Sequence, residues 1–262
     1  MREIPEGLKE NAGVYYHGDY CLYSGVRRID DNNIYTSAYD NGAIRSVSFN
    51  LVSMEIYYKP NYAAVTVEFE DGSIAKWDTK WISVYNTLPG IAVSKDGRYV
   101  FVQTWENGLH CLDARTGEKV WRTKSKRGIT SIFVSESTVL CHQRERALQL
   151  LDIHTGEVLK EKRPATGWDF AAIDHRHIVC QVTARRWEII DVATLEVKRS
   201  YTHKEFTNGH EDYCVRDILL EGSELVVRGF KNVWDESVSP AKLLPNLEFE
   251  HRFTIDLDDN EE

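Results

Sequence analysis

The chain has 262 residues and a formal net charge of −9 at pH 7, which is long enough for one domain with a large buried core. No apolar run approaches the roughly 20 residues that cross a bilayer, and the residues after Met1 lack the apolar core of a secretory signal. We therefore expect no membrane segment and a cytoplasmic location. The five cysteines are odd in number and show no CxxC spacing, which predicts buried free thiols.

Nearly all of the predicted elements are β-strands. We expect a lead-in over residues 1–12, a single domain over 13–255 and an acidic disordered tail over 256–262. Asp40-Asn41-Gly42 and Asp71-Gly72 have the composition of hairpin turns, and we place them in successive sheets. The strands expected around these two turns are 34–39, 43–49, 54–58, 62–70, 73–77 and 81–85.

A repeat of 39 residues organises the middle of the chain. Cys111–Trp121 recurs as Leu150–Lys160 and, more weakly, as Ile189–Lys198, so that Asp113, Asp152 and Asp191 are equivalent. Each copy is expected to form a strand, a tight turn and a strand. The turn is Asp-x-x-Thr-Gly, in which the carboxylate accepts backbone N–H groups and glycine takes a positive φ.

Four strands in about 40 residues predict an all-β fold, a β-propeller of four-stranded blades. Middle hairpins expected near residues 42, 72, 108, 146, 186 and 231 indicate six blades. Seven blades are the alternative, if the terminal segments pair within one blade and so remove an open sheet edge.

The repeat resembles that of the quinoprotein (pyrroloquinoline quinone-dependent) alcohol dehydrogenases and related WD-type propellers. Leu112-Asp113-Ala114-Arg115-Thr116-Gly117-Glu118-Lys119-Val120-Trp121 carries the resemblance. In these relatives the repeat is a scaffold, so the resemblance implies a fold and no chemistry of its own. The sequence has no adjacent cysteine pair, and no residue of a quinone site can be matched. We expect a non-catalytic member without a cofactor.

No catalytic or metal site is predicted. Asp113 and its equivalents should be held in turns rather than converge as catalytic carboxylates. An insertion of about eight residues near 203–213 holds several metal-ligating side chains, but it has no HExxH motif, so a polar surface loop is expected. The rival hypothesis is a propeller hydrolase or lactonase, with Trp168 and Asp169 at the mouth of the central channel.

Charge is distributed unevenly along the chain. Residues 113–204 contain 17 Lys/Arg and 12 Asp/Glu, a net charge of +5, and the remainder is −14. Several arginines fall at hairpin tips that share one face with tryptophans, among them Trp234, and arginine and tryptophan are typical of protein interfaces. The alternative is that the indoles pack between blades and the charges are solvated. The partner-binding residues that we predict are Trp105, Arg144, Arg146, Trp168, Arg185, Arg186, Trp187 and His210.

The sequence thus favours a scaffold that binds a protein partner, of which an immunity or antitoxin protein is one specific form. Nucleic acid is not expected as the partner, because the acidic remainder of the chain would repel a polyanion.

Overall fold

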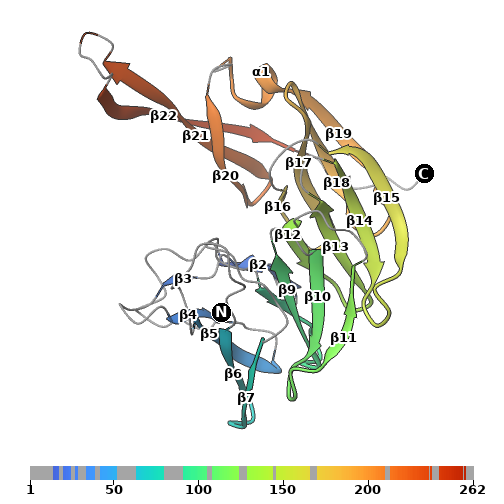
Figure 1. Cartoon of the computed structure of the whole chain (residues 1–262). Coiled ribbons are helices and arrows are strands. Elements are labelled where there is room, and N and C mark those ends of the chain that lie inside the picture. Colours follow the sequence, from blue (N-terminus) through green and yellow to red (C-terminus); the bar gives the residue numbers. More distant parts are fainter. Residues whose placement is uncertain are drawn as a thin grey trace.

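The protein is almost entirely β in the computed structural model (Figure 1). Among the described residues, the helical content is one four-residue helix, α1 (His203–Phe206). None of the helical structure described is long and apolar enough to cross a membrane. The described residues are 14–17, 20–24, 27–28, 34–38, 42–51, 63–79, 91–104, 108–123, 129–143, 146–165, 170–209, 213–235, 237, 242–255 and 257.

Three four-stranded antiparallel blades follow the 39-residue repeat and confirm the predicted unit. Within each blade, strands that are consecutive in the sequence are paired. The first blade is β8 (Ile91–Val93), β9 (Tyr99–Thr104), β10 (Gly108–Asp113) and β11 (Lys119–Arg122). The second is β12 (Ile129–Val134), β13 (Thr138–Gln143), β14 (Arg146–Asp152) and β15 (Val158–Ala165). The third is β16 (Phe170–Ala172), β17 (His177–Thr183), β18 (Arg186–Asp191) and β19 (Val197–Thr202).

The amino-terminal part forms a single sheet where the sequence predicted two. Strand β5 pairs with β6, so the turns near 42 and 72 belong to one blade. The physical reason is burial: Val47 and Val67 lie opposite each other in this pairing and both are fully buried. The strands predicted at 54–58 and 81–85 lie outside the described residues. The sheet is β3 (Arg27–Arg28), β4 (Ile34–Ala38), β5 (Ile44–Leu51), β6 (Ala63–Phe69) and β7 (Ile74–Asp78).

The carboxy-terminal sheet has three strands, β20 (Cys214–Glu221), β21 (Glu224–Asp235) and β22 (Lys242–Thr254). The hairpin predicted near residue 231 is wrong, because β21 continues through that position and Lys231 pairs with Leu247. The pairing of the two terminal segments, on which the seven-bladed alternative depends, is also not found among the described strands. Instead, β1 (Val14–His17) pairs with β2 (Tyr20–Ser24), and β2 pairs with β8 and β12. The number of blades therefore stays a prediction.

The core lies between neighbouring blades. Ile178 packs in a cluster with residues of β12–β14, whereas the next residue, Val179, packs in a cluster with residues of β20–β22. This alternation follows from the two-residue period of a strand, and it explains why both faces of the inner strands are apolar. Leu257, in the segment predicted as a disordered tail, packs against the second of these clusters. The rest of that tail and the lead-in lie outside the described residues.

The cysteine prediction is confirmed for Cys111, Cys141 and Cys180, which are free and buried. Burial raises the pKa of the Cys141 thiol to about 12, so this thiol stays protonated. Cys214 is also free, but it is exposed at the start of β20, which corrects the expectation that every thiol is buried.

The three Asp-x-x-Thr turns are confirmed in detail. In the second, Asp152 Oδ1 accepts hydrogen bonds from the backbone N–H groups of His154 (3.0 Å) and Thr155 (2.8 Å) and from the Thr155 hydroxyl (3.0 Å). The turns at Asp113 and Asp191 repeat the same three bonds. We call the end of the blades that carries these turns the turn face.

A tryptophan from the preceding blade rests on each glycine-containing turn. The Trp121 indole donates a 2.8 Å hydrogen bond to the Ile153 carbonyl, and a Cβ placed on Gly156 would lie 2.6 Å from the ring. Trp77 stands in the same relation to Gly117. The two glycines take φ values of +70° and +71°, as the motif predicts, and they also leave room for the indole.

Candidate functional site

The opposite end of the blades carries the middle hairpins. Strand β10 begins at one of these hairpins and ends at a turn of the turn face, so the two lie at opposite ends of the blade. The hairpins predicted at Gly108, Arg146 and Arg185–Arg186 are confirmed by the pairing of β9 with β10, β13 with β14, and β17 with β18. The β21–β22 hairpin is the corresponding one in the last sheet. We call this end the hairpin face.

Three of the predicted arginines are exposed on the hairpin face. Arg146 begins β14, while Arg185 and Arg186 form the tip between β17 and β18. Trp105, Arg144, Trp168 and His210, like the channel candidate Asp169, lie outside the described residues. The structure therefore brings part of the predicted cationic set to the ends of two neighbouring blades.

A buried carboxylate anchors Arg186. One oxygen of Glu188 lies 2.9 Å from the Arg186 guanidinium, and the other lies 3.2 Å from the Lys162 ammonium of the preceding blade. The Glu188 side chain is only 4% exposed. A carboxylate with so little contact with water is stabilised by paired cations. Arg186 is thus partly structural, whereas Arg185 stands at the open tip.

Arg146 takes part in a second polar network, on β14 and β15. Gln149 donates a 2.6 Å hydrogen bond to Glu161. This bond, together with the positive charges of Arg163 and Arg146, holds the pKa of the Glu161 carboxyl below its usual range. Glu161 therefore remains an anion near neutral pH, and it partly offsets the positive charge of this hairpin.

Trp187 does not lie on the surface. Its ring is 7% exposed and stacks on Phe206 with centroids 4.6 Å apart, and its indole N–H donates to His203 Nδ1 at 3.1 Å. The expectation that Trp187 contributes an exposed apolar contact is wrong, because α1 covers it. For Trp187 the alternative reading of the sequence is therefore the correct one: its indole packs within the core.

The insertion after β19 is a short helix that braces the hairpin tip. Thr202 caps α1 by accepting from the Glu205 N–H, and the Glu205 carboxylate accepts from the Thr202 N–H at 2.8 Å. The His203 N–H donates to the Arg185 carbonyl at 2.8 Å. Within the described part of the chain, no three His, Cys, Asp or Glu side chains converge as metal ligands would.

The hairpin face has an apolar extension that was not predicted from the sequence. The last pair between β20 and β21 is Cys214 with Phe230, and beyond it β21 pairs with β22 (Figure 1, where this hairpin projects at the upper left). Trp234 is 53% exposed, Leu247 54% and Leu244 38%. The sequence has no turn pair such as Asn-Gly near residue 231, and this absence could have indicated that the strand continues there. We call residues 231–235 and 242–247 the ribbon.

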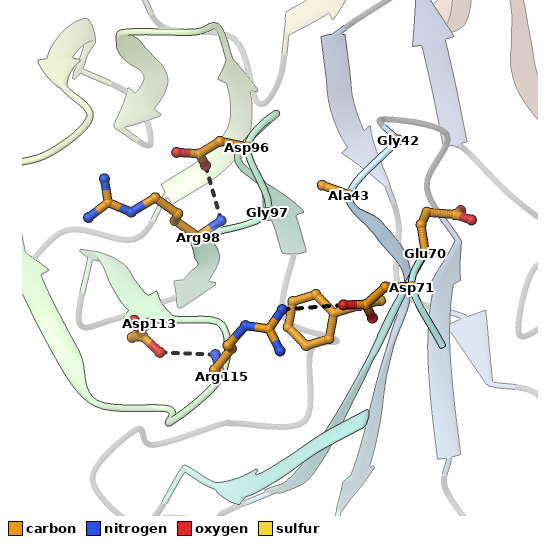
Figure 2. Close-up of a pocket in the computed structure, with 10 residues that line it drawn as sticks. Gly42, Ala43, Glu70, Asp71, Asp96, Gly97, Arg98, Asp113 and Arg115 are labelled. Atoms are coloured by element: carbon orange, nitrogen blue, oxygen red, sulfur yellow. Dashed lines mark hydrogen bonds and ion pairs between the residues drawn. The ribbon is translucent and has the colours of Figure 1, made fainter. Parts of the chain in front are cut away.

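The turn face holds a cavity of about 310 Å³ between the blades of β3–β7 and β8–β11 (Figure 2). Several of its charged groups already have partners among nearby side chains or backbone. The Arg115 guanidinium lies 4.2 Å from the centre of the Phe69 ring and 3.7 Å from Asp71, while Asp96 accepts from the Arg98 N–H at 3.0 Å. We interpret this cavity as a polar seam between blades. Nothing local in the sequence marks it, because it depends on how two blades pack.

Comparison with known proteins supports the repeat. A PQQ-repeat family model, described as outer membrane protein assembly factor BamB, matches residues 65–183. Residues 65–183 are propeller repeats of the PQQ type. The matched stretch is less than half of the chain, and it contains the first two complete blades of the 39-residue repeat. No curated protein matches the sequence.

Solved structures with a similar arrangement of the backbone share little sequence identity with this chain. BamB from Moraxella catarrhalis is 15% identical with a TM-score of 0.45, over 80% of this chain and 62% of that one. The Cps50 (Swd1) β-propeller domain of Myceliophteria thermophila is 16% identical with a TM-score of 0.47, over 79% of this chain and 67% of that one. The designed protein Ika8 is 13% identical with a TM-score of 0.47, over 82% of this chain and 79% of that one.

Proposed function

We propose that this chain is a non-catalytic propeller scaffold that binds a protein partner through its hairpin face. The observation that carries the proposal is the exposure of Arg146, Arg185 and Arg186 at hairpin tips of neighbouring blades. Guanidinium groups so placed make paired hydrogen bonds with carboxylates. Rigid blades hold the tips in position, and loops on a rigid scaffold are common binding sites.

The partner is expected to present carboxylates to this face. An immunity or antitoxin role is the specific form that we propose, with the partner being the protein that is neutralised. The description of the matched family model as an assembly factor supports contact with other proteins. The free buried thiols support a reducing compartment such as the cytoplasm.

The test is charge reversal at two tips. Arg146→Glu with Arg185→Glu should reduce recovery of the partner from a native lysate at least tenfold, with the melting temperature nearly unchanged. Arg186 is left intact, because a glutamate there would face the buried Glu188 and destabilise the fold. Raising the salt concentration should reduce the recovery of the partner by the wild type, and it should therefore narrow the difference in recovery between the wild type and the double variant.

The matched control makes the same charge change elsewhere. Arg98 lies on the turn face and Arg199 on the outer strand β19, and both are exposed. Arg98→Glu with Arg199→Glu should recover the partner as the wild type does. Equal losses in the two double variants would mean that net charge, rather than the hairpin face, governs binding. A nuclease-treated lysate excludes bridging by nucleic acid.

A further inference from the structure

We propose that the ribbon is the apolar part of the same interface, and that it binds an acidic segment of the partner that also carries apolar side chains. This inference rests on the proposed function and specifies the chemistry of the partner. The ribbon would provide the apolar contact that the buried Trp187 cannot provide.

The ribbon is an elongated version of a hairpin that the other blades also have. β21 and β22 contain 12 and 13 residues, whereas the corresponding β17 and β18 contain 7 and 6. The added length lies beyond the Cys214–Phe230 pair, where the described pairing is that of a two-stranded antiparallel hairpin. Such a hairpin is only marginally stable in water by itself, so a bound segment would stabilise it.

Large apolar side chains gather on the ribbon. Val233 pairs with Leu244 and Lys231 with Leu247, and residues paired across an antiparallel hairpin lie on the same face. Leu247 is 54% exposed and Leu244 38%, and Trp234 on the same ribbon is 53% exposed. Trp234 follows Val233 in β21 and therefore lies on the opposite face of the ribbon from Leu244 and Leu247. Single exposed leucines are ordinary on a protein surface, but large apolar side chains exposed on both faces of so short a ribbon indicate a binding surface.

The charges of the hairpin face favour an acidic protein segment over the other occupants. A second copy docked face to face would bring the arginine tips of two copies together, and like charges repel. An anionic membrane would attract the tips, but it would be repelled by the net charge of −9 on the whole chain. A segment with carboxylates beside apolar residues satisfies both Arg185 and the ribbon.

Site-specific photo-cross-linking in the full chain tests this inference. Benzoylphenylalanine replaces Leu247 on the ribbon, Ala184 at the β17–β18 tip, or Leu159 on the outer strand β15. Leu159 is the matched control, because it is also a leucine and is 52% exposed. Cross-linked peptides are sequenced by mass spectrometry. We expect one partner protein at positions 247 and 184, with an acidic peptide containing apolar residues at 247, and no product at 159.

The other outcomes separate the two proposals. A partner captured at 184 and not at 247 would overturn the ribbon inference and leave the proposed function standing. A product at 247 that is a basic peptide, a lipid or a second copy of this chain would also overturn the inference. No partner at either position would overturn both. Once the partner is identified, Leu247→Ser should weaken its affinity at least tenfold and Leu159→Ser less than twofold.

Discussion

The turn face and the hairpin face differ in how closely they follow the repeat. On the turn face, three successive blades form the same Asp-x-x-Thr turn with the same three hydrogen bonds to each carboxylate. On the hairpin face, the blades differ from one another. The β17–β18 tip carries Arg185, whose carbonyl accepts a hydrogen bond from α1, and the β21–β22 hairpin is lengthened into the ribbon. The repeated turns thus hold each blade in the same way, whereas the variation between blades is on the hairpin face, where we propose that the partner binds.

The turn face also shows two ways of filling a blade junction. Trp121 rests on Gly156, whereas at the next junction Lys160 stands where the tryptophan would be and Leu195 where the glycine would be. Leu195 takes φ +58°, an uncommon value for a residue with a side chain. It is 8% exposed and packs in a cluster with residues of the preceding blade. A leucine side chain thus supplies the apolar contact that an indole supplies elsewhere.

The largest expected effect on stability comes from a substitution on the turn face. Trp121→Ala removes a ring that is 7% exposed and leaves the Ile153 carbonyl without its indole donor. We expect a loss of about 3–5 kcal/mol in the free energy of unfolding, measured by urea denaturation. Trp234→Ala, on the exposed ribbon, is the control and should cost less than about 1 kcal/mol. Similar losses in both variants would remove the contrast between the two faces.

The next effect separates backbone strain from steric collision. Gly156→Val combines a positive φ with a clash against the Trp121 ring, and we expect a loss of about 2–4 kcal/mol. Gly72→Val has a positive φ of +82° but no neighbouring atom within 4 Å of its new Cβ, so strain alone should cost about 1–2 kcal/mol. The comparison uses urea denaturation of both variants. Equal losses would show that the indole does not rest on Gly156.

A double-mutant cycle tests whether the two junctions are alternative solutions. Leu195→Gly removes a buried side chain, and Lys160→Trp adds an indole where Leu195 now packs. We expect each single variant to be less stable than the wild type and the double variant to recover about 1–2 kcal/mol relative to the sum of the two. Strict additivity would mean that positions 160 and 195 do not share a junction.

The smallest effect concerns pH. Burial raises the pKa of Asp191, but hydrogen bonds from Thr194 and Ala193 and the charge of Arg176 outweigh it, so the folded-state pKa lies below its ordinary value of 3.8. The stabilisation is therefore complete above pH 3.8 and is lost as pH falls through the lower folded-state pKa. Asp191→Asn should flatten the decline in melting temperature in that range. An unchanged slope would show that this carboxylate does not titrate differently on folding.

The sequence predicted the parts of the fold that depend on local chemistry. The Asp-x-x-Thr turns and the tips at Arg146 and Arg185 follow from residue type and a 39-residue spacing, and the structure confirms them. The assignment of β5 and β6 to one sheet depends on which strands meet after a long connection, which no local pattern determines. The burial of Trp187 depends on α1, which arises from an insertion outside the repeat. The ribbon was not predicted, because the distance by which β21 and β22 extend past the end of β20 depends on the pairing of the whole sheet.

Amide hydrogen exchange of the chain with and without its recovered partner tests most directly whether the hairpin face binds. Peptides covering 183–187 and 242–247 should exchange more slowly in the complex, because binding excludes water from the β17–β18 tip and the ribbon. Peptides covering the turns at 113–117 and 152–156 should exchange at the same rate in both states. Protection at the turns with none at the tip and the ribbon would contradict the assignment of binding to the hairpin face.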